Sequence, residues 1–244
     1  MPQQYLWKCA QSNMSSSNDI SALSPRDYFE ELLAEYLPWL VHSEQLDLFD
    51  RFMEIFVAYN AHTNLSAIRE PLAIVEKHFV DSLMLARFEG EGLKNATILD
   101  IGTGGGFPGI PLAIISPESY IVLLDSTGKK IKACNEFVQA LGLSVRVTAY
   151  QGRAEELLHL PNGAIHAGAY DFVVSRATAA MPDILGWAAP FIRPDGAIFL
   201  YKTPSQEEHI TGLQIARRLS LKLANTYRYS LAGQDRSILK FIRA

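Results

Sequence analysis

A glycine-rich stretch, ILDIGTGGGFPGI at residues 98–110, has the spacing in this chain that most clearly indicates ligand binding. Gly104, Gly106 and Gly109 satisfy the G-x-G-x-x-G pattern of dinucleotide-binding loops, and Asp125 follows at the distance expected of a ribose-binding acid. The same stretch also reads D-x-G-x-G-x-G from Asp100 to Gly106. Both patterns predict close approach of the backbone to a ligand, but they favour different ligands.

The charge of Asp100 separates these ligands. A dinucleotide places an anionic pyrophosphate over such a loop, where a carboxylate would repel it by roughly 1 to 4 kcal/mol at intermediate dielectric. S-adenosylmethionine carries no phosphate, and its sulfonium is a cation. We therefore predict S-adenosylmethionine as the cofactor, held by Asp100, Gly102 and Gly104. An NAD-dependent oxidoreductase is disfavoured further, because no proton-relay histidine or Tyr-x-x-x-Lys follows the loop.

Two later stretches supply further candidate contacts. Asp125 ends the second apolar run and is able to accept both ribose hydroxyls, a role common to NAD and S-adenosylmethionine sites. It would alternatively cap the following helix. In GRAEELL, the Ala154 backbone or the Glu155 side chain is a candidate partner for the adenine amine. An ordinary exposed acid in a first helical turn is an equal interpretation of Glu155.

The elements that position these residues are strands and helices in alternation. After Gly92 come five short apolar runs, ATILDI, SYIVLLD, SVRVTAY, YDFVVS and GAIFLYK, separated by helix-like stretches. This order predicts a parallel sheet covered on both faces, with the glycine loop at the carboxyl end of its first strand. Two final runs, LKLANTYRYSL and RSILKFIRA, are joined by residues 232–235 and predict a hairpin.

The first 95 residues show helical periodicity instead. Ser24-Pro25 and then Ser43 are typical N-terminal caps of two amphipathic helices, and a third helix is expected from Pro71 to Phe88. Residues 10–24 are rich in Ser and Asn. We interpret residues 1–24 as a flexible leader and residues 25–95 as an N-terminal helical region.

Composition places the chain among folded globular proteins. Of its 244 residues, 48% are hydrophobic and only 20% charged, which is unlike a disordered chain. No apolar run reaches the roughly 18 residues needed to span a bilayer, and the first residues do not resemble a signal peptide. Cys9 and Cys134 suit neither a disulfide framework nor a metal site. We expect a cytoplasmic protein with no metal and no membrane partner.

Charge is distributed unevenly along the chain. Residues 1–97 carry 7 Lys and Arg against 14 Asp and Glu, whereas residues 98–244 carry 15 against 12. From His209 onward seven basic residues accompany a single acid, Asp235. Such a run is typical of a solvated face, and a nucleic-acid footprint is the alternative.

Six stretches in the same order resemble one known family. They are YNAHTNLSAI (59–68), KHFVDSL (77–83), LDIGTGGGFPGIPLAI (99–114), LLDSTGKK (123–130), GRAE (152–155) and VSRA (174–177). The chain from about Pro25 to its end is similar to the bacterial RsmG (GidB) family of 16S ribosomal RNA guanine-N7 methyltransferases.

The resemblance implies a class I, Rossmann-like methyltransferase domain at residues 96–244, whose mostly parallel seven-stranded sheet ends in an antiparallel hairpin. The N-terminal helices are an extension of it. Cofactor contacts implied by the family fall on Gly102, Phe107, Asp125, Ala154, Glu155 and Arg176. One departure is that Thr203-Pro204 follows Lys202, where the family has Lys-Gly. This puts the conformation of that loop in doubt.

The residues also test the implied reaction. Amine methylation of bases uses Asn/Asp-Pro-Pro-aromatic after strand four, where this chain has Ser175-Arg176-Ala177, and pyrimidine C5 methylation needs a cysteine that is absent there. Guanine N7 has a lone pair and no proton, so its methylation requires alignment but no general base. We therefore predict no catalytic acid or base. Arg176 and Lys202 are the predicted substrate-binding residues, with a structural ion pair as the alternative for Arg176 and a solvated lysine as the alternative for Lys202.

The predicted partner is 16S ribosomal RNA or an assembly intermediate of the small ribosomal subunit. An A-form duplex hides N7 in its deep groove, so the target is expected to be an unpaired guanine. We expect a monomer. Two alternatives stay open: a small-molecule methyltransferase on the same fold, and a non-enzymatic ribosome-assembly factor that binds RNA.

Overall fold

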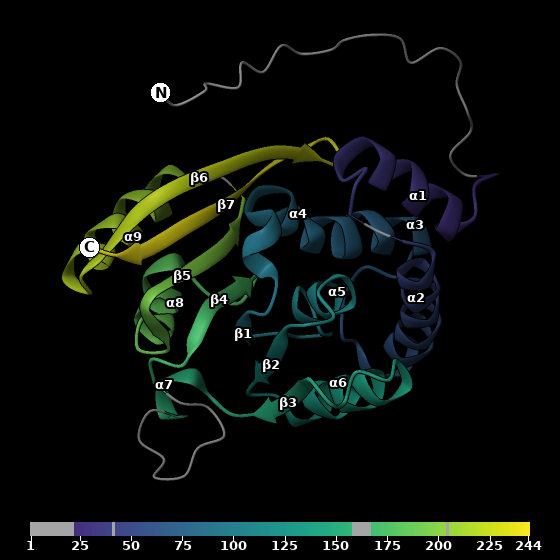
Figure 1. Cartoon of the computed structure of the whole chain (residues 1–244), viewed down its shortest axis with the longest axis horizontal. Helices are drawn as coiled ribbons and strands as arrows, with labels where there is room; N and C mark the ends of the chain where they lie inside the picture. The colour runs from purple at the N-terminus through teal and green to yellow at the C-terminus, as the bar shows by residue number, and fades with distance from the viewer. Residues whose placement is uncertain (1–21, 41, 158–166, 204) are drawn as a thin grey trace, which may run out of the picture.

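The computed structural model describes residues 22–40, 42–157, 167–203 and 205–244, shown in Figure 1. Most of the predicted leader and Pro204 of the Thr203-Pro204 loop lie outside these residues. The described part contains a single seven-stranded sheet with the order β3-β2-β1-β4-β5-β7-β6.

The predicted sheet is confirmed. Its parallel strands are β1 (Thr97–Ile101), β2 (Tyr120–Asp125), β3 (Val147–Gln151), β4 (Tyr170–Arg176) and β5 (Ile192–Lys202). Between β5 and β6 (Leu221–Leu231), β7 (Gln234–Arg243) runs antiparallel to both. The hairpin turn is only two residues long, because Ala232 and Gly233 both adopt positive φ. Strand order reverses between β1 and β4, which places the glycine loop at the expected ligand-binding edge.

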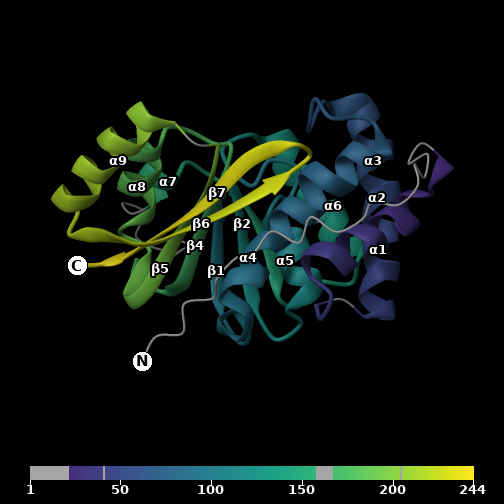
Figure 2. The ribbon, with the colours of Figure 1, turned by 90° about the horizontal axis from the view of Figure 1, so that it is seen from above.

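Helices cover both faces of the sheet. On one face lie α5 (Gly109–Ile115) and α6 (Gly128–Ala140), which pack on β1, β2 and β3. The other face is covered by α7 (Ala154–Leu157), α8 (Met181–Ala188) and α9 (Gln206–Arg218). Figure 2 shows α8 and α9 on the opposite side of the molecule from α1, α2 and α3. Each face therefore has its own buried hydrophobic cluster.

The first two helices form where the sequence predicts them, with one correction. α1 (Pro25–Tyr36) begins after Ser24, whose hydroxyl accepts a hydrogen bond from the Asp27 N–H. α2 (Ser43–Thr63) is capped by His42, so the prediction of Ser43 as the cap was wrong. His42 has the extended conformation of a cap, and its N–H donates to Gln45 Oε1 at 2.8 Å.

The third predicted helix changes its type in the middle. It consists of α3 (Pro71–Ile74), a π-helical segment η2 (Val75–Val80) and α4 (Asp81–Glu89), followed by a short 3-10 helix η3 (Gly90–Leu93). The prediction of a helix from Pro71 to Phe88 is confirmed, since these segments are contiguous, and the structure adds that its middle is π-helical. A π segment this short lies within a single run of helical sequence, so the apolar periodicity did not reveal it. It contains His78 and is followed directly by Asp81.

The N-terminal helices share a core with the glycine loop. Phe29, Phe49, Phe52 and Phe79 are buried, and the ring of Phe79 contacts the other three. Phe52 lies 5.3 Å from Phe107 between ring centroids. Such aromatic contacts contribute roughly 0.5 to 1.5 kcal/mol each beyond area burial. The helical region is thereby coupled directly to the loop that carries the candidate site.

Candidate active site

The glycine loop brings open backbone to the end of β1. Gly102 and Gly104 have φ values of 74° and 59°, which strongly favour glycine. A Cβ on Gly102 would lie 2.2 Å from the Thr178 side chain, so no larger residue fits there. A Cβ on Gly104 would meet no atom closer than 4.0 Å. Gly104 therefore leaves room for a ligand beside the backbone.

Asp100 lies beneath this loop. It is fully buried, and its Oδ2 accepts hydrogen bonds from Thr103 Oγ1 at 2.7 Å and from the Gly109 N–H at 2.9 Å. Among the described residues its Oδ1 has no partner. Burial raises the pKa of the carboxyl to about 7. Asp100 thus ties both ends of the loop together, while its direct contact with a cofactor stays a prediction.

A cavity of about 270 Å³, called cavity A, opens beside Asp125. This carboxylate is 7% exposed and accepts from the Thr127 N–H at 2.8 Å and the Gly104 N–H at 3.1 Å, with Lys130 Nζ at 3.4 Å. Gly102, Ala154 and Glu155 also line cavity A. The structure thus gathers four sequence-predicted residues around one hollow.

The donor set of cavity A fits the adenosine half of S-adenosylmethionine. Asp125 is an acceptor at the end of β2, suited to ribose hydroxyls, and Gly102 of the loop between β1 and α5 lines the same cavity. Ala154 and Glu155 begin α7 after β3 and border the same cavity, so they are in position to meet the base. Lys130 also lines it and is ion-paired with Asp125.

A second cavity of about 340 Å³, cavity B, lies on the other side of the glycine loop. It is bordered by Gly104, Phe107, His78 and Arg176. Three residues, Gly102, Lys130 and Ala177, line cavities A and B alike. The two cavities therefore meet at the glycine loop, and a ligand that fills both would pass Gly102.

A buried ion cluster at cavity B was missed by the sequence interpretation. Asp81 is 1% exposed, and its Oδ2 accepts from Arg176 at 2.9 Å and from Arg236 at 3.2 Å. Its Oδ1 accepts from Tyr229 Oη at 2.8 Å. The available signal was an acid among the apolar residues of KHFVDSL, but its partners come from three distant strands, β4, β6 and β7, which spacing along the chain does not reveal.

Arg176 belongs both to this cluster and to the cavity wall. It donates to the Lys77 carbonyl at 3.0 Å, and its guanidinium lies 5.4 Å from the centre of the Phe107 ring. The structural ion pair considered for arginine at this position is thus present. Its border on cavity B also leaves the predicted ligand contact geometrically feasible.

His78 connects Arg176 with the loop after α2. Its ring stacks on Phe107 with centroids 4.6 Å apart, Nδ1 lies 3.2 Å from Arg176 and Nε2 lies 2.8 Å from Ser66 Oγ. Burial, and secondly the charge of Arg176, lowers the pKa of His78 to about 3. A neutral imidazole accepts from Arg176 and donates to Ser66, so His78 acts as a fixed connector between them.

Lys202 lies in a third hollow, cavity C, of about 250 Å³. Its Nζ donates to Glu208 Oε1 at 2.5 Å and to the Ala179 carbonyl at 2.8 Å. It is neither a solvated lysine nor a free phosphate contact in this structure. Cavity C shares Asp81, Arg176 and Arg236 with cavity B.

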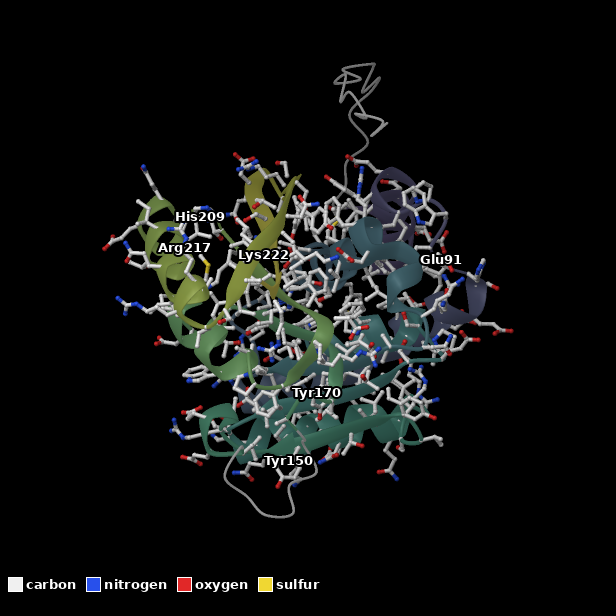
Figure 3. All side chains as sticks on the ribbon, turned by 60° about the vertical axis from the view of Figure 1, so that its left-hand side comes forward. Glu91, Tyr150, Tyr170, His209, Arg217 and Lys222 are labelled. Atoms are coloured by element: carbon white, nitrogen blue, oxygen red, sulfur yellow. The ribbon has the colours of Figure 1, made fainter. Side chains whose placement is uncertain are left out.

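The basic C-terminal segment does not form one patch beside these cavities. Arg217 lies in the last turn of α9 and Lys222 is the second residue of β6, opposite Ile242 near the end of β7. Figure 3 shows Arg217 and Lys222 far from Glu91. Arg236 and Lys240 are ion-paired with Asp81 and Glu89. Tyr227 and Tyr229 donate to the same two acids. Much of the run therefore serves the fold.

The described part of the chain contains neither a metal-binding cluster nor a membrane-spanning helix. No group of three or more His, Cys, Asp or Glu side chains is arranged to hold a metal ion. No helix there is long and apolar enough to cross a membrane.

The family model described as rRNA small subunit methyltransferase G matches residues 45–238, including the glycine loop and all three cavities. The chain belongs to this family. A member from Oenococcus oeni is 32% identical over 218 residues, covering 89% of this chain and 88% of the relative. A member from Chlorobaculum tepidum is 37% identical over 181 residues, covering 74% and 79%. Both carry the name "Ribosomal RNA small subunit methyltransferase G".

Solved structures agree on the fold of this methyltransferase family member. The O-methyltransferase from Bacillus cereus in complex with SAH superposes with a TM-score of 0.59 at 18% identity, over 90% of this chain and 100% of that one. A SAM-dependent methyltransferase from Aquifex aeolicus gives 0.55 at 17% identity, over 74% and 97%. The predicted family and fold class are confirmed.

Proposed function

We propose that this protein transfers a methyl group from S-adenosylmethionine to N7 of a guanine in 16S ribosomal RNA. The observation that carries the proposal is the junction of cavities A and B at Gly102, in a chain that belongs to the rRNA small subunit methyltransferase G family. One cavity suits an adenosine and the other adjoins it at the edge where a second substrate would enter.

In this proposal the adenosine lies in cavity A. Asp125 accepts the ribose hydroxyls, Ala154 and Glu155 meet the adenine, and the backbone around Gly102 and Gly104 faces the methionine end. Bound S-adenosylmethionine supplies an electrophilic methyl carbon on its sulfonium. Phe107 and Arg176, on the wall of cavity B, form the side facing that methyl group.

The acceptor side requires positioning and no proton transfer. Guanine N7 attacks with an in-plane lone pair and loses no proton, so alignment is the main contribution of the protein. The acidic and imidazole groups at cavity B match this requirement: Asp81 is fully engaged in hydrogen bonds, and burial keeps His78 neutral. Neither residue is needed as a base.

The RNA would reach the site as an unpaired guanosine, in 16S ribosomal RNA or in an assembly intermediate of the small subunit. Binding then depends on the base pocket and on few phosphate contacts, since the chain has a net charge of −4. Lys202 and Arg176 are the proposed substrate contacts. We further propose a monomer that acts in the cytoplasm, with a helical region at 25–95 and a catalytic domain at 96–244.

Calorimetry tests the cofactor half of the proposal. We expect the purified protein to bind S-adenosylhomocysteine and to show no binding of NADH at the same concentration. Binding of NADH in place of S-adenosylhomocysteine would contradict it.

Cleavage at 7-methylguanosine tests the RNA half. Borohydride and aniline treatment of 16S ribosomal RNA, followed by primer extension, should show one site that a deletion strain lacks and that the restored gene recovers. An unchanged pattern would favour the small-molecule enzyme or the assembly factor. Asp125→Ala then distinguishes these two, because it should weaken cofactor binding by about 10 to 100 times, and so slow any methyl transfer at low S-adenosylmethionine, while leaving assembly binding intact.

A further inference from the structure

We propose that cavity C receives the acceptor base and that Glu208 is the residue that selects guanine there. This inference rests on the proposed function and names the base-reading group of the same site. It concerns a carboxylate that neither the glycine loop nor the ion cluster around Asp81 requires.

Cavity C is placed to hold a base whose N7 faces the methyl donor. It lies at the carboxyl ends of β4 and β5, and it meets cavity B along Arg176, Ala177 and Arg236. Its far side is formed by Lys202, Thr203 and Glu208. A purine that presents N7 toward cavity B therefore directs its Watson–Crick edge toward Lys202 and Glu208.

Only one of the two carboxylates that border cavity C is available to a ligand. Asp81 is 1% exposed, and both of its oxygens already accept hydrogen bonds from Tyr229, Arg176 and Arg236. The Glu208 side chain is 26% exposed. Its Oε1 accepts from Lys202 at 2.5 Å and the Met181 N–H at 2.6 Å, whereas Oε2 has no protein partner among the described residues.

Glu208 is held in position and charged. Partial burial opposes its ionisation, but the hydrogen bonds from Lys202 and the Met181 N–H outweigh that effect and lower its pKa. Because Oε1 is fixed by two donors from different elements, the direction of Oε2 is fixed with it. Glu208 thus places an anionic acceptor on the border of cavity C, and it also borders a neighbouring hollow together with Met181 and His209.

Such an acceptor distinguishes guanine from adenine. Guanine offers two donors on its Watson–Crick edge, N1–H and the N2 amine, and a carboxylate accepts both. Adenine has an acceptor at N1, which would face the carboxylate with an unpaired lone pair. Both purines possess N7, so the methyl acceptor atom alone cannot exclude adenine. Selection must come from the opposite edge.

The other end of cavity C suits the remaining guanine atom. O6 lies next to N7 and would therefore point toward the cavity B side. Arg236 borders both cavities, and its side chain is 21% exposed. Its guanidinium carries several N–H donors, so a carbonyl oxygen on that side of the cavity would be a matching acceptor. The two ends of the pocket thus complement the two polar edges of guanine.

The test removes the N2 amine from the target guanine and, separately, the negative charge from Glu208. 16S ribosomal RNA is prepared with guanosine or inosine at the target position, assembled with small-subunit proteins, and methylated in single-turnover reactions. Inosine keeps N1–H, O6 and N7 but lacks the N2 amine. Wild-type protein should methylate the guanosine form about 10 to 100 times faster, as expected for a hydrogen bond to a charged group.

Glu208→Gln should reduce this preference to within about threefold, because an amide offers no charged acceptor. Glu207→Gln, which changes the exposed neighbour, should keep the wild-type preference. A merely structural role of Glu208 would slow both RNA forms equally and leave the ratio intact, which would overturn the inference.

The wild-type reaction decides the question even if Glu208→Gln does not fold. Equal rates on the guanosine and inosine forms would show that no protein group contacts the N2 amine, and would also overturn the inference. Failure of the proposed function looks different, since neither RNA form would then be methylated at all.

Discussion

Cavity A and the ion cluster of Asp81 hold their charged groups in opposite ways. Asp125 in cavity A receives backbone N–H groups from residues 104 and 127, and its one ionic partner, Lys130, is partly exposed. Asp81 is buried and neutralised by Arg176 and Arg236, which come from β4 and β7. Loop backbone positions the first carboxylate, and side-chain charge positions the second.

This difference predicts that Asp125 mainly affects ligand binding and that Asp81 mainly affects the stability of the fold. A carboxylate held by loop N–H groups is oriented toward a hollow, so its removal should affect ligand affinity more than folding. A carboxylate enclosed by two guanidinium groups compensates buried charge, so its removal leaves cations in a medium of low dielectric. The two sites should therefore respond in different measurements to the same kind of substitution.

The largest effect is expected from Asp81→Ala. It leaves Arg176 and Arg236 buried without their shared partner, so the free energy of unfolding should fall by about 3 to 5 kcal/mol. Urea denaturation measures this. Glu156→Ala, which removes an exposed partner of Arg153, is the matched control and should change the value by less than about 1 kcal/mol. Equal effects of the two substitutions would remove the distinction.

Asp100→Asn tests whether burial of the Asp100 carboxylate beneath the glycine loop lowers the free energy of unfolding. The folded pKa of about 7 lies above the ordinary value of 3.8, so the folded state binds more protons between these values, and stability falls as pH rises through them. The variant should gain stability relative to wild type from pH 4 to pH 7, by up to about 4 kcal/mol. Denaturation at pH 4, 5.5 and 8 measures the gain.

The pH 4 point is the internal control for this series, because folded Asp100 is then protonated and neutral, as Asn is, so the variant should gain less than about 1 kcal/mol there. A difference between Asp100 and its variant that stays constant with pH would contradict the assigned shift. The plateau should lie above pH 7.

Asp125→Ala should act mainly on binding. Loss of a charged acceptor for two hydroxyls is expected to weaken S-adenosylhomocysteine binding by about 10 to 100 times. Unfolding free energy should change less than for Asp81→Ala. Calorimetry with Asp183→Ala, an exposed acid on α8, provides the control. If the Asp125→Ala variant bound S-adenosylhomocysteine normally but had a much lower free energy of unfolding, Asp125 would serve stability, as Asp81 does, and the prediction would be contradicted.

The smallest effect is expected at the edge away from the cavities. Arg217→Glu with Lys222→Glu reverses two exposed charges where α9 ends and β6 begins. Because neither residue borders cavities A, B or C, single-turnover RNA methylation should stay within about threefold of wild type at 0.15 M salt, where the Debye length is about 8 Å. A larger loss would extend the RNA contact to this edge.

The parts of the site that follow single strands could be predicted from the sequence. Asp125 and Ala154 are fixed by the local order of strand, loop and helix, and the structure brings them to one cavity. The hairpin of β6 and β7 was also predictable, because Gly233 and the flanking apolar runs define it locally.

The ion cluster could not be predicted because its members lie far apart in the chain. Asp81 follows a π-helical segment, and Arg236 reaches it only after β7 inserts between β5 and β6. The basic residues after His209 could not be placed for the same reason. Their number suggested one solvated face, but Arg236 and Lys240 point inward to form ion pairs with Asp81 and Glu89.

Methyl transfer with purified components tests directly whether the protein methylates N7 of a guanine in 16S ribosomal RNA. The protein is incubated with labelled S-adenosylmethionine and small subunits from a strain that lacks the gene, and the 16S ribosomal RNA is digested to nucleosides for mass spectrometry. We expect label in 7-methylguanosine, and about 10 to 100 times less of it at low S-adenosylmethionine concentration when Asp125→Ala replaces the wild-type protein. Label in another nucleoside, or no label in RNA while a small molecule is methylated, would contradict this expectation.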